Sequence, residues 1–230
     1  RYWIVFNGEV YNYLEIRDEL IEKGHDFNSN TDAEVILKSY IEWGAHCLKK
    51  FNGMWAFAIW DKEKKELFCA RDRFGIKPFY YYNKEDYFVF ASEIKAVIEA
   101  EDVPKEPNYE RILQYLGNYP LLENQSTFFK DIFQLPSSHF ALVNAKGMTI
   151  ERYWDIEKKN IEGVDEKEKF LEYFKESIRL RLRSDVPIGT CLSGGLDSSS
   201  IVCVLSNMID TSKQKTFSSC FEDKRFDERE

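Results

Sequence analysis

The sequence predicts an α+β fold in which an N-terminal antiparallel sheet sandwich with helices is followed by the start of an α/β domain with a parallel sheet. Short apolar runs alternate with charged turns over the first 100 residues, which is typical of antiparallel strands. After residue 165 the pattern becomes strand, glycine-containing turn, helix and strand, which opens a βαβ unit. The 230 residues correspond to about one and a half domains of about 150 residues each. We therefore expect one domain over 1–155 and an incomplete second one over 156–230.

Composition excludes several classes of protein. Hydrophobic residues make up 43% of the chain, aromatic residues 16% and charged residues 31%, which is too apolar for a disordered or low-complexity protein. The net charge of −8 gives no reason to expect nucleic acid or an anionic membrane as a partner. The longest apolar run, residues 54–60, is far shorter than the roughly 18 residues of a membrane-spanning helix, so we expect a soluble protein.

Cysteine usage indicates a reducing compartment. The five cysteines are odd in number, form no CxxC pair and lie mostly within apolar runs, which favours buried thiols over a disulfide framework. We therefore expect a cytoplasmic protein. The sequence opens at Arg1 and enters an apolar run at once, so we expect it to be cut within the fold, and the lack of a signal peptide carries no weight.

The first elements follow from apolar periodicity and capping residues. Residues 2–6 predict a buried strand, and residues 13–23 predict a short amphipathic helix that ends before a glycine. A second helix begins at Thr31, because residues 31–34 form a capping box. In such a box the Thr31 hydroxyl accepts a hydrogen bond from the Glu34 amide while the Glu34 side chain reaches back to the cap.

The middle of the chain is predicted to be rich in strands. Four strand-like runs follow one another between charged turns, at residues 54–60, 66–70, 79–82 and 87–91. We expect them to form one antiparallel meander that packs against a second layer, because two of the runs are apolar on both faces. The other elements of this half are helices over 93–100 and 108–116 and a hairpin over 140–153 that turns at Lys146-Gly147.

From Asp165 the pattern changes to that of an α/β domain. Apolar residues at helical spacing predict a long charged helix, with Leu171, Phe174, Ile178 and Leu182 on one face. The predicted βαβ unit then consists of a strand over 187–192, a turn over 193–197, a helix over 198–208 and a strand over 216–221.

The strongest chemical motif is the turn at residues 192–199, which reads Leu-Ser-Gly-Gly-Leu-Asp-Ser-Ser. Two glycines between a strand and a helix let the backbone fold closely around an anion, Ser193 and Ser198 add hydroxyl donors, and the helix N-terminus adds unpaired amides. The motif lacks the lysine of a Walker A loop and the spacing of a dinucleotide-binding turn. It predicts a phosphate-binding loop, and the alternative is an ordinary turn with Ser198 as helix N-cap.

This turn resembles the pyrophosphate-binding loop of the N-type ATP pyrophosphatase family, and residues 184–187 resemble the segment that precedes it in asparagine synthetases. Members of that family cleave ATP between its α and β phosphates. The resemblance therefore implies ATP and Mg2+ as cofactors. It also implies that Leu192 lies beside the nucleotide, that Asp197 helps to place the magnesium ion, and that the pyrophosphate is held by Ser193, Gly194, Gly195, Asp197 and Ser198.

A second motif, Asn7-Gly8-Glu9, directly follows the first strand. An asparagine amide and a glycine N–H at a strand end can form an oxyanion hole, although Asn-Gly alone is also a common turn. Together with Asp32 and the blocks at 71–80 and 91–96, the motif resembles the glutaminase domain of class II glutamine amidotransferases, which is an αββα sandwich.

This second resemblance implies roles for four residues. Those that match Asn7 and Gly8 stabilise the tetrahedral oxyanion and help to bind glutamine, and those that match Glu9 and Asp32 bind its α-amino group. Asp32 also suits a structural role as an acid in the first turn of a helix, and both roles are compatible. The block at 71–80 is interpreted as mainly structural, as a turn and part of the sheet core.

The nucleophile implied by the resemblance is an N-terminal cysteine whose own amino group acts as general base. Neither that cysteine nor the arginine that binds the glutamine carboxylate lies in this sequence, so we expect the cysteine to precede Arg1. Cys191 is expected to be a packed core thiol in mid-strand rather than a replacement. His25, His46 and His139 lack the spacing of metal ligands and receive no role.

The combination of both halves resembles glutamine-hydrolysing asparagine synthetase over nearly all 230 residues. The resemblance implies a ligase that takes glutamine, aspartate and ATP, forms β-aspartyl-AMP with release of pyrophosphate, and yields asparagine and AMP. Alternatives are a related amidotransferase that acts on another carboxylate, such as a sugar acid of a surface polysaccharide, a lactam-forming synthetase without glutaminase chemistry, and a non-catalytic fragment. We expect the 230-residue piece by itself to be inactive, and the sequence leaves a homodimer open.

Overall fold

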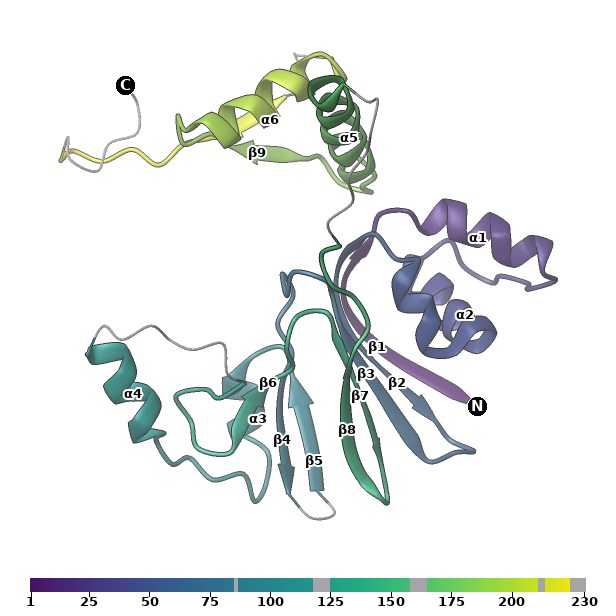
Figure 1. Ribbon diagram of the computed structural model, residues 1–230, viewed down its shortest axis with the longest axis vertical. Coiled ribbons are helices and arrows are strands. Elements are labelled where there is room, and N and C mark those ends of the chain that lie inside the picture. Colours follow the sequence, from purple (N-terminus) through teal and green to yellow (C-terminus); the bar gives the residue numbers. More distant parts are fainter. Residues whose placement is uncertain (85–86, 118–124, 158–164, 211–213, 224–230) are drawn as a thin grey trace. The chain divides into compact units, whose positions relative to one another are not determined.

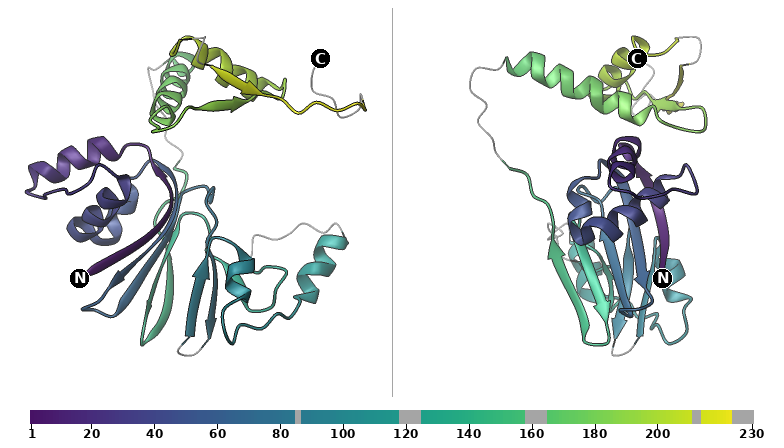
Figure 2. Two further views of the ribbon diagram at one scale, coloured as in Figure 1. Left: turned by 180° about the vertical axis from the view of Figure 1, so that it is seen from behind. Right: turned by 90° about the vertical axis from the view of Figure 1, so that its right-hand side faces the viewer.

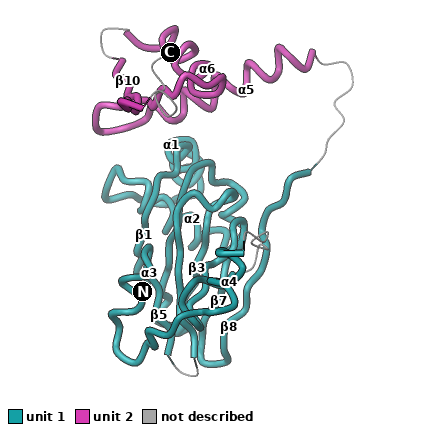
Figure 3. The backbone as a smooth tube through the Cα atoms, turned by 90° about the vertical axis from the view of Figure 1, so that its left-hand side faces the viewer, with its two compact units in different colours: residues 1–157 teal, residues 158–230 magenta. Residues whose placement is uncertain are grey.

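The computed structural model describes residues 1–84, 87–117, 125–157, 165–210 and 214–223. The chain divides into two compact units, residues 1–157 and 158–230 (Figure 3). No helix in the described ranges is both long and apolar enough to cross a membrane. The domain boundary expected after residue 155 remains a prediction.

The first unit is built on two antiparallel sheets (Figure 1). The larger sheet has the order β1-β2-β3-β7-β8, with β1 (Tyr2–Val10), β2 (Gly53–Asp61), β3 (Glu66–Arg71), β7 (His139–Asn144) and β8 (Gly147–Arg152). The smaller sheet has the order β5-β4-β6, with β4 (Tyr80–Lys84), β5 (Tyr87–Ala91) and β6 (Ile132–Gln134). Neighbouring strands in both sheets are antiparallel.

The single meander predicted for the middle strands is wrong, because these strands divide between the two sheets. The chain leaves the larger sheet after β3 in a turn organised by Asp72, which is 1% exposed. Its carboxylate accepts hydrogen bonds from the backbone amides of Trp55, Phe74, Ile76 and Lys77. A buried carboxylate that is satisfied by backbone amides fixes the turn and directs β4 into the smaller sheet.

The two sheets pack face to face, and helices cover their outer faces. The larger sheet is covered by α1 (Tyr13–Glu22), α2 (Asp32–Trp43) and the short helix η1 (Gly44–Lys49), and the smaller one by α3 (Ile94–Ile98) (Figures 1 and 2). The layer order is therefore helix, sheet, sheet, helix. It confirms the predicted α+β class and the sandwich.

Alternation of side chains along the strands explains how these layers pack. Alternate side chains of β1 enter the core beneath α1 and α2, namely Tyr2, Ile4 and Phe6. The core between the sheets combines small side chains with large ones: Ala56, Ala58, Cys69, Phe79, Tyr81 and Leu135. Small residues in the larger sheet thus leave room for the aromatic rings that face it.

The capping box predicted at the start of α2 is only half correct. Thr31 is the N-cap, and its hydroxyl accepts a hydrogen bond of 3.4 Å from the Glu34 amide. The Glu34 carboxylate instead accepts from the amides of Asn28 and Ser29 and from the Ser29 hydroxyl, while the Thr31 amide donates to Ser29. Because these donors precede the cap, Glu34 ties the incoming loop to the helix.

The remaining elements of this unit differ from prediction in smaller ways. The hairpin of β7 and β8 is confirmed, with Ala145 and Lys146 between its paired strand ends. α4 (Tyr109–Leu116) begins after its N-cap Asn108, as expected. Sequence reasoning misses β6, because its strand conformation depends on pairing with β4 rather than on a local apolar run.

The second unit contains the predicted βαβ segment. α5 (Glu166–Arg181) precedes β9 (Gly189–Cys191), α6 (Leu196–Ser206) and β10 (Lys215–Phe217). β9 and β10 pair in parallel, which requires the crossover that α6 supplies and confirms the α/β pattern. The helix begins two residues before the predicted start at residue 198.

The expectation that most cysteines are buried is wrong for the second unit. Cys47 and Cys69 in the first unit are buried, whereas Cys191, Cys203 and Cys220 are exposed. Cys191 is the last residue of β9, in a two-stranded sheet. So small a sheet cannot bury both of its faces, and a place in a strand therefore does not bury this thiol.

Candidate functional site

Gly8 allows β1 to run close against β2. It pairs with Trp55 and has a φ of 144°, a backbone conformation that residues with side chains rarely adopt. A Cβ on Gly8 would collide with the carbonyl oxygen of Met54 and would lie 2.6 Å from the Cα of Trp55. Because both are backbone atoms of a paired strand, position 8 requires glycine.

The N–H group of Gly8 points away from β2. The Tyr11 amide donates to the Asn52 carbonyl at one end of the β1–β2 ladder (2.8 Å). At the other end the Lys62 amide donates to the Arg1 carbonyl (3.2 Å). In the antiparallel register, these bonds place odd-numbered residues of β1 in the hydrogen-bonded pairs, so even-numbered residues direct their N–H groups outward. Within the described residues β1 is an edge strand, so the Gly8 N–H faces an unpaired edge.

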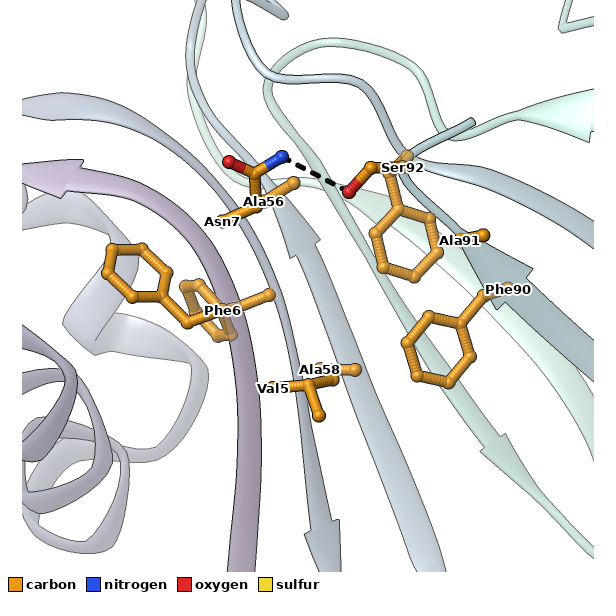
Figure 4. A pocket seen from close by; sticks show the side chains of 10 residues that line it. Val5, Phe6, Asn7, Ala56, Ala58, Phe90, Ala91 and Ser92 are labelled. Atoms are coloured by element: carbon orange, nitrogen blue, oxygen red, sulfur yellow. Dashed lines mark hydrogen bonds between the residues drawn. The ribbon is translucent and has the colours of Figure 1, made fainter. Parts of the chain in front are cut away.

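The Asn7 side chain links the larger sheet to the smaller one (Figure 4). Its Nδ2 donates a hydrogen bond of 3.1 Å to the hydroxyl of Ser92, the residue that follows β5. Both residues border a cavity of about 390 Å³, whose lining also includes Val5, Ala58 and Phe90. The amide of Asn7 and the N–H of Gly8 thus belong to adjacent residues within β1, not after its end as predicted, and two such donors can serve a single oxyanion.

Asp32 lies at the C-terminal end of β1, the end that carries Asn7 and Gly8. It is the first residue of α2, and its Oδ2 accepts a hydrogen bond of 3.0 Å from the Val10 amide. Val10 directly follows Glu9, whose exposed side chain lies on the same face of β1 as that of Asn7. The structure therefore brings Asn7, Gly8, Glu9 and Asp32 together around one half of β1. Asp32 also occupies the first turn of α2, as its alternative structural role requires.

The block at 71–80 supports the sheets. Arg71 is 7% exposed, and its guanidinium donates hydrogen bonds of 2.7 Å to the carbonyl oxygens of Gly75, Lys77 and Leu135. Burial lowers the pKa of Arg71, an effect that neighbouring Asp72 opposes. These bonds and the Asp72 turn confirm the structural interpretation of this block.

In the second unit, the loop between β9 and α6 is held by its own serines. The Ser198 hydroxyl donates to the Gly195 carbonyl (3.1 Å) and accepts from the Ser193 amide (3.2 Å). Gly194 has a φ of 76°, in the left-handed region that favours glycine. The N-cap of α6 is Gly195, so the alternative in which Ser198 caps the helix is wrong. Ser198 instead closes the loop from within the first turn.

The N-cap of α6 is a glycine, which has no side chain to cap the amides of the first turn. Residues 193–197 are exposed. The 11 residues of α6 align their peptide dipoles and give this end a partial positive charge. Amides, hydroxyls and a positive dipole end are the groups that bind phosphate at helix N-termini.

Two further predicted residues flank this loop. Leu192 is held at the end of β9 by a hydrogen bond of 2.8 Å from its amide to the Phe217 carbonyl. Asp197 is the second residue of α6 and is exposed. In the described ranges, no group of three or more His, Cys, Asp or Glu side chains could hold a metal ion. Mg2+ in nucleotide sites is usually held by one or two carboxylates together with phosphate oxygens, and a carboxylate beside this loop fits that mode.

Ser92 is the residue of the first site that sequence reasoning misses. The block at 91–96 contributes to the family resemblance, but no local signal assigns a function to Ser92. Its hydrogen bond to Asn7 spans 85 positions in the sequence. Such a contact arises from the packing of one sheet on the other, which no short motif encodes.

Two family models match the chain. The model of the glutamine amidotransferase domain matches residues 1–154, and the model of asparagine synthase matches residues 169–230. Together they cover the elements that carry both groups of candidate residues.

Several curated proteins are similar to this chain. A putative glutamine-hydrolysing asparagine synthetase 2 from Methanocaldococcus jannaschii is 39% identical over 96% of this chain and 43% of its own length. Glutamine-hydrolysing asparagine synthetase 3 from Bacillus subtilis is 38% identical over 88% of this chain and 33% of its own. A protein named amidase chry2 from Gibberella zeae is 31% identical over 89% of this chain and 31% of its own. The chain thus spans less than half the length of each.

Among solved structures, the chain is similar to glutamine phosphoribosylpyrophosphate amidotransferase from B. subtilis in complex with ADP and GMP. The match has a TM-score of 0.47 and 17% sequence identity, and it covers 97% of this chain and 46% of that one.

Proposed function

Because the chain belongs to the glutamine amidotransferase domain family and continues into the start of an asparagine synthase domain, we propose that the full-length protein transfers the amide nitrogen of glutamine to an ATP-activated carboxylate. The proposed acceptor is aspartate, and the products are asparagine, glutamate, AMP and pyrophosphate. The observation that carries the proposal is the presence of two groups in one chain: Asn7, Gly8, Glu9 and Asp32 around β1, and residues 193–198 at the N-terminus of α6.

In the glutaminase half, Asn7 and Gly8 are proposed to form the oxyanion hole. Attack on the side-chain amide of glutamine moves negative charge onto its carbonyl oxygen, and the Asn7 Nδ2 and the Gly8 N–H would stabilise that charge. The proposed nucleophile is a cysteine outside this sequence. Burial raises the pKa of both Cys47 and Cys69 and keeps them as neutral thiols, which are poor nucleophiles.

Glu9 and Asp32 are proposed to bind the α-amino group of glutamine. Carboxylates bind an ammonium through charge-assisted hydrogen bonds, which are stronger than those between neutral groups. The Val10 amide binds Oδ2 of Asp32, and Oδ1 is the atom proposed to bind the ligand. A free α-amino group distinguishes glutamine from a glutamine side chain within a peptide. This pair would therefore select the free amino acid.

In the synthetase half, the loop before α6 is proposed to hold the pyrophosphate part of ATP. The support is the uncapped N-terminus of α6 and the left-handed conformation of Gly194. The proposed contacts are Ser193, Gly194, Gly195, Asp197 and Ser198, with Leu192 beside the nucleotide. Asp197 would also hold Mg2+, which when bound neutralises charge on the phosphates.

Identification of the amidated product tests this proposal. The full-length protein is incubated with MgATP, aspartate and glutamine that carries 15N in its side-chain amide, and the products are identified by mass. We expect labelled asparagine, with one AMP and one pyrophosphate formed for each asparagine. A parallel reaction without ATP should give no labelled asparagine. Formation of ADP and phosphate in place of AMP and pyrophosphate would contradict the assignment of the loop.

A second candidate function is the amidation of another carboxylate, such as a sugar acid. One observation bears on it: a relative 31% identical over 89% of the chain is named amidase chry2, so similar chains do not all carry the name of an asparagine synthetase. The same assay is therefore run with a panel of carboxylic acids in place of aspartate. Label transfer to one of these acids, with none to aspartate, would favour this candidate.

A further inference from the structure

The orientation of the Asn7 amide matters for an oxyanion hole. An asparagine amide has a donor nitrogen and an acceptor oxygen on opposite sides, and rotation by a half-turn exchanges them. With Nδ2 toward the developing charge the amide stabilises an oxyanion, and with Oδ1 there it repels one. A fixed rotamer is therefore a requirement of the chemistry proposed for Asn7.

Packing alone does not hold this amide. Asn7 is exposed, and it lies on an edge strand beside a cavity of about 390 Å³. β2 contributes Ala56, Phe57 and Ala58 to the lining of this cavity, and the residue paired with Asn7 is the small Ala56 (Figure 4). In the part of the chain that the structure describes, the Asn7 side chain makes one hydrogen bond, from Nδ2 to Ser92 Oγ at 3.1 Å.

The Ser92 hydroxyl accepts in this arrangement, in which Nδ2 rather than Oδ1 of Asn7 lies toward it. Ser92 lies between β5 and α3, and the preceding residue, Ala91, pairs with Tyr80 in the smaller sheet. The amide nitrogen of Asn7 carries two N–H groups. One of them binds Ser92, and the second is left to donate to a ligand.

We propose that Ser92 is a positioning residue that holds the Asn7 amide with its nitrogen toward the oxyanion. The inference rests on the proposed function of Asn7 and extends it to the smaller sheet. Ser92 does not touch the substrate in this proposal. It acts through Asn7, so its loss should slow the chemical step and leave glutamine binding nearly unchanged.

Glutaminase kinetics of the full-length protein test this role. Loss of one oxyanion donor typically lowers kcat by about 100-fold to 1,000-fold. Because Ser92→Ala leaves Asn7 present but free to rotate, we expect a smaller loss in kcat, of about tenfold, with KM within about twofold. Ser92→Thr retains the hydroxyl and should restore most of the rate. Ser137→Ala, which removes an exposed serine hydroxyl elsewhere in the first unit, is the control and should have no effect.

A double-mutant cycle separates positioning from a general structural effect. If Ser92 acts through Asn7, then Ser92→Ala should cause no further loss when Asn7 is already alanine. An equal loss in both backgrounds would overturn the inference. Ser92→Cys is nearly isosteric and has a weaker hydrogen-bonding group. It should give an intermediate rate, and it keeps the test available if the alanine variant does not fold.

The outcomes also distinguish this inference from the proposal on which it rests. If Asn7→Ala has full glutaminase activity, the proposed oxyanion role of Asn7 fails, and the role of Ser92 fails with it. If Asn7→Ala loses activity while Ser92→Ala retains it, only the role of Ser92 is overturned. Urea unfolding of each variant, compared with that of the unaltered protein, shows whether the first unit is folded.

Discussion

Gly8 and Gly147 both have positive φ angles, but their surroundings differ. Gly8 has a φ of 144° and lies against the backbone of β2 at Met54 and Trp55. Gly147 has a φ of 115°, and a Cβ built on it would meet nothing within 4 Å. Substitution of the two glycines by alanine therefore distinguishes two sources of destabilisation. At Gly147 the backbone is strained, and at Gly8 the added Cβ also collides with the neighbouring strand.

We expect Gly8→Ala to be much more destabilising than Gly147→Ala. Strain alone should cost Gly147→Ala about 1–2 kcal/mol of the free energy of unfolding. At position 8 the collision adds to the strain, so the loss should be roughly 3 kcal/mol or more. Urea unfolding of both variants and the unaltered protein measures the difference. Equal losses would mean that β1 and β2 separate easily enough to admit a methyl group.

At the scale of elements, the start of α2 depends on one carboxylate. Glu34 accepts hydrogen bonds from the amides of Asn28 and Ser29 and from the Ser29 hydroxyl. Burial raises its pKa, but these hydrogen bonds outweigh burial and hold the pKa below the ordinary value of 4.5. The same helix carries Asp32, so the loop that Glu34 anchors also positions a proposed glutamine ligand.

The lowered pKa sets the pH dependence of this anchor. A carboxylate whose pKa is lower in the folded state stabilises the fold above its ordinary pKa and loses this effect as the pH falls through the folded value. We expect Glu34→Gln to be less stable than the unaltered protein by about 1 kcal/mol at pH 7. This gap should narrow as the pH falls below 4.5.

Urea unfolding at several pH values checks this prediction. Glu22→Gln is the matched control, because Glu22 is exposed at the end of α1 and lies outside the anchored loop. It should change stability little at any pH. The free energy of unfolding of Glu34→Gln is compared with that of the unaltered protein at each pH. If the difference stays constant from pH 7 to pH 3, the role of the charged carboxylate is contradicted.

At the scale of the whole molecule, the two groups of candidate residues belong to different compact units. Asp32 lies in the unit of residues 1–157 and Asp197 in that of residues 158–230. If each unit carries out one half of the proposed reaction, then a substitution in one half should spare the other. The two aspartates allow a reciprocal test, because each is the control for the other.

We expect Asp32→Asn to impair only the use of glutamine. Asparagine keeps an oxygen that can accept from the Val10 amide but loses the charge that would bind the substrate ammonium. The KM for glutamine should rise by at least about tenfold, while synthesis from ammonium persists. Asp197→Ala should show the reverse, with loss of ATP-dependent pyrophosphate release and retained glutaminase activity.

Assays of glutamine hydrolysis and of pyrophosphate release measure both effects in the full-length protein. Asp26→Asn, at an exposed position close to Asp32 in sequence, controls for a change of charge on that surface. Loss of both activities in either folded variant, or of neither, would contradict the assignment of two separate sites.

Much of the fold, including the elements that carry both groups of candidate residues, could be predicted from local patterns. The apolar run of β1, the cap at Thr31 and the strand-turn-helix pattern around residue 193 depend on neighbours in the sequence, and the structure has each of them. The division of the middle strands between two sheets could not be predicted in this way. It depends on the buried Asp72, whose amide partners include Trp55 on another strand.

The sequence by itself determined the class of the fold, most of its elements and the motifs on which the family rests. These are properties of short segments, because hydrophobic period, caps and glycine turns act over a few residues. Only the tertiary structure decided that Asp32 meets Val10, that Ser92 meets Asn7, and that the Gly8 N–H lies at a sheet edge with no partner strand among the described residues. Those facts depend on strand register and on sheet packing, which bring together residues far apart in the chain.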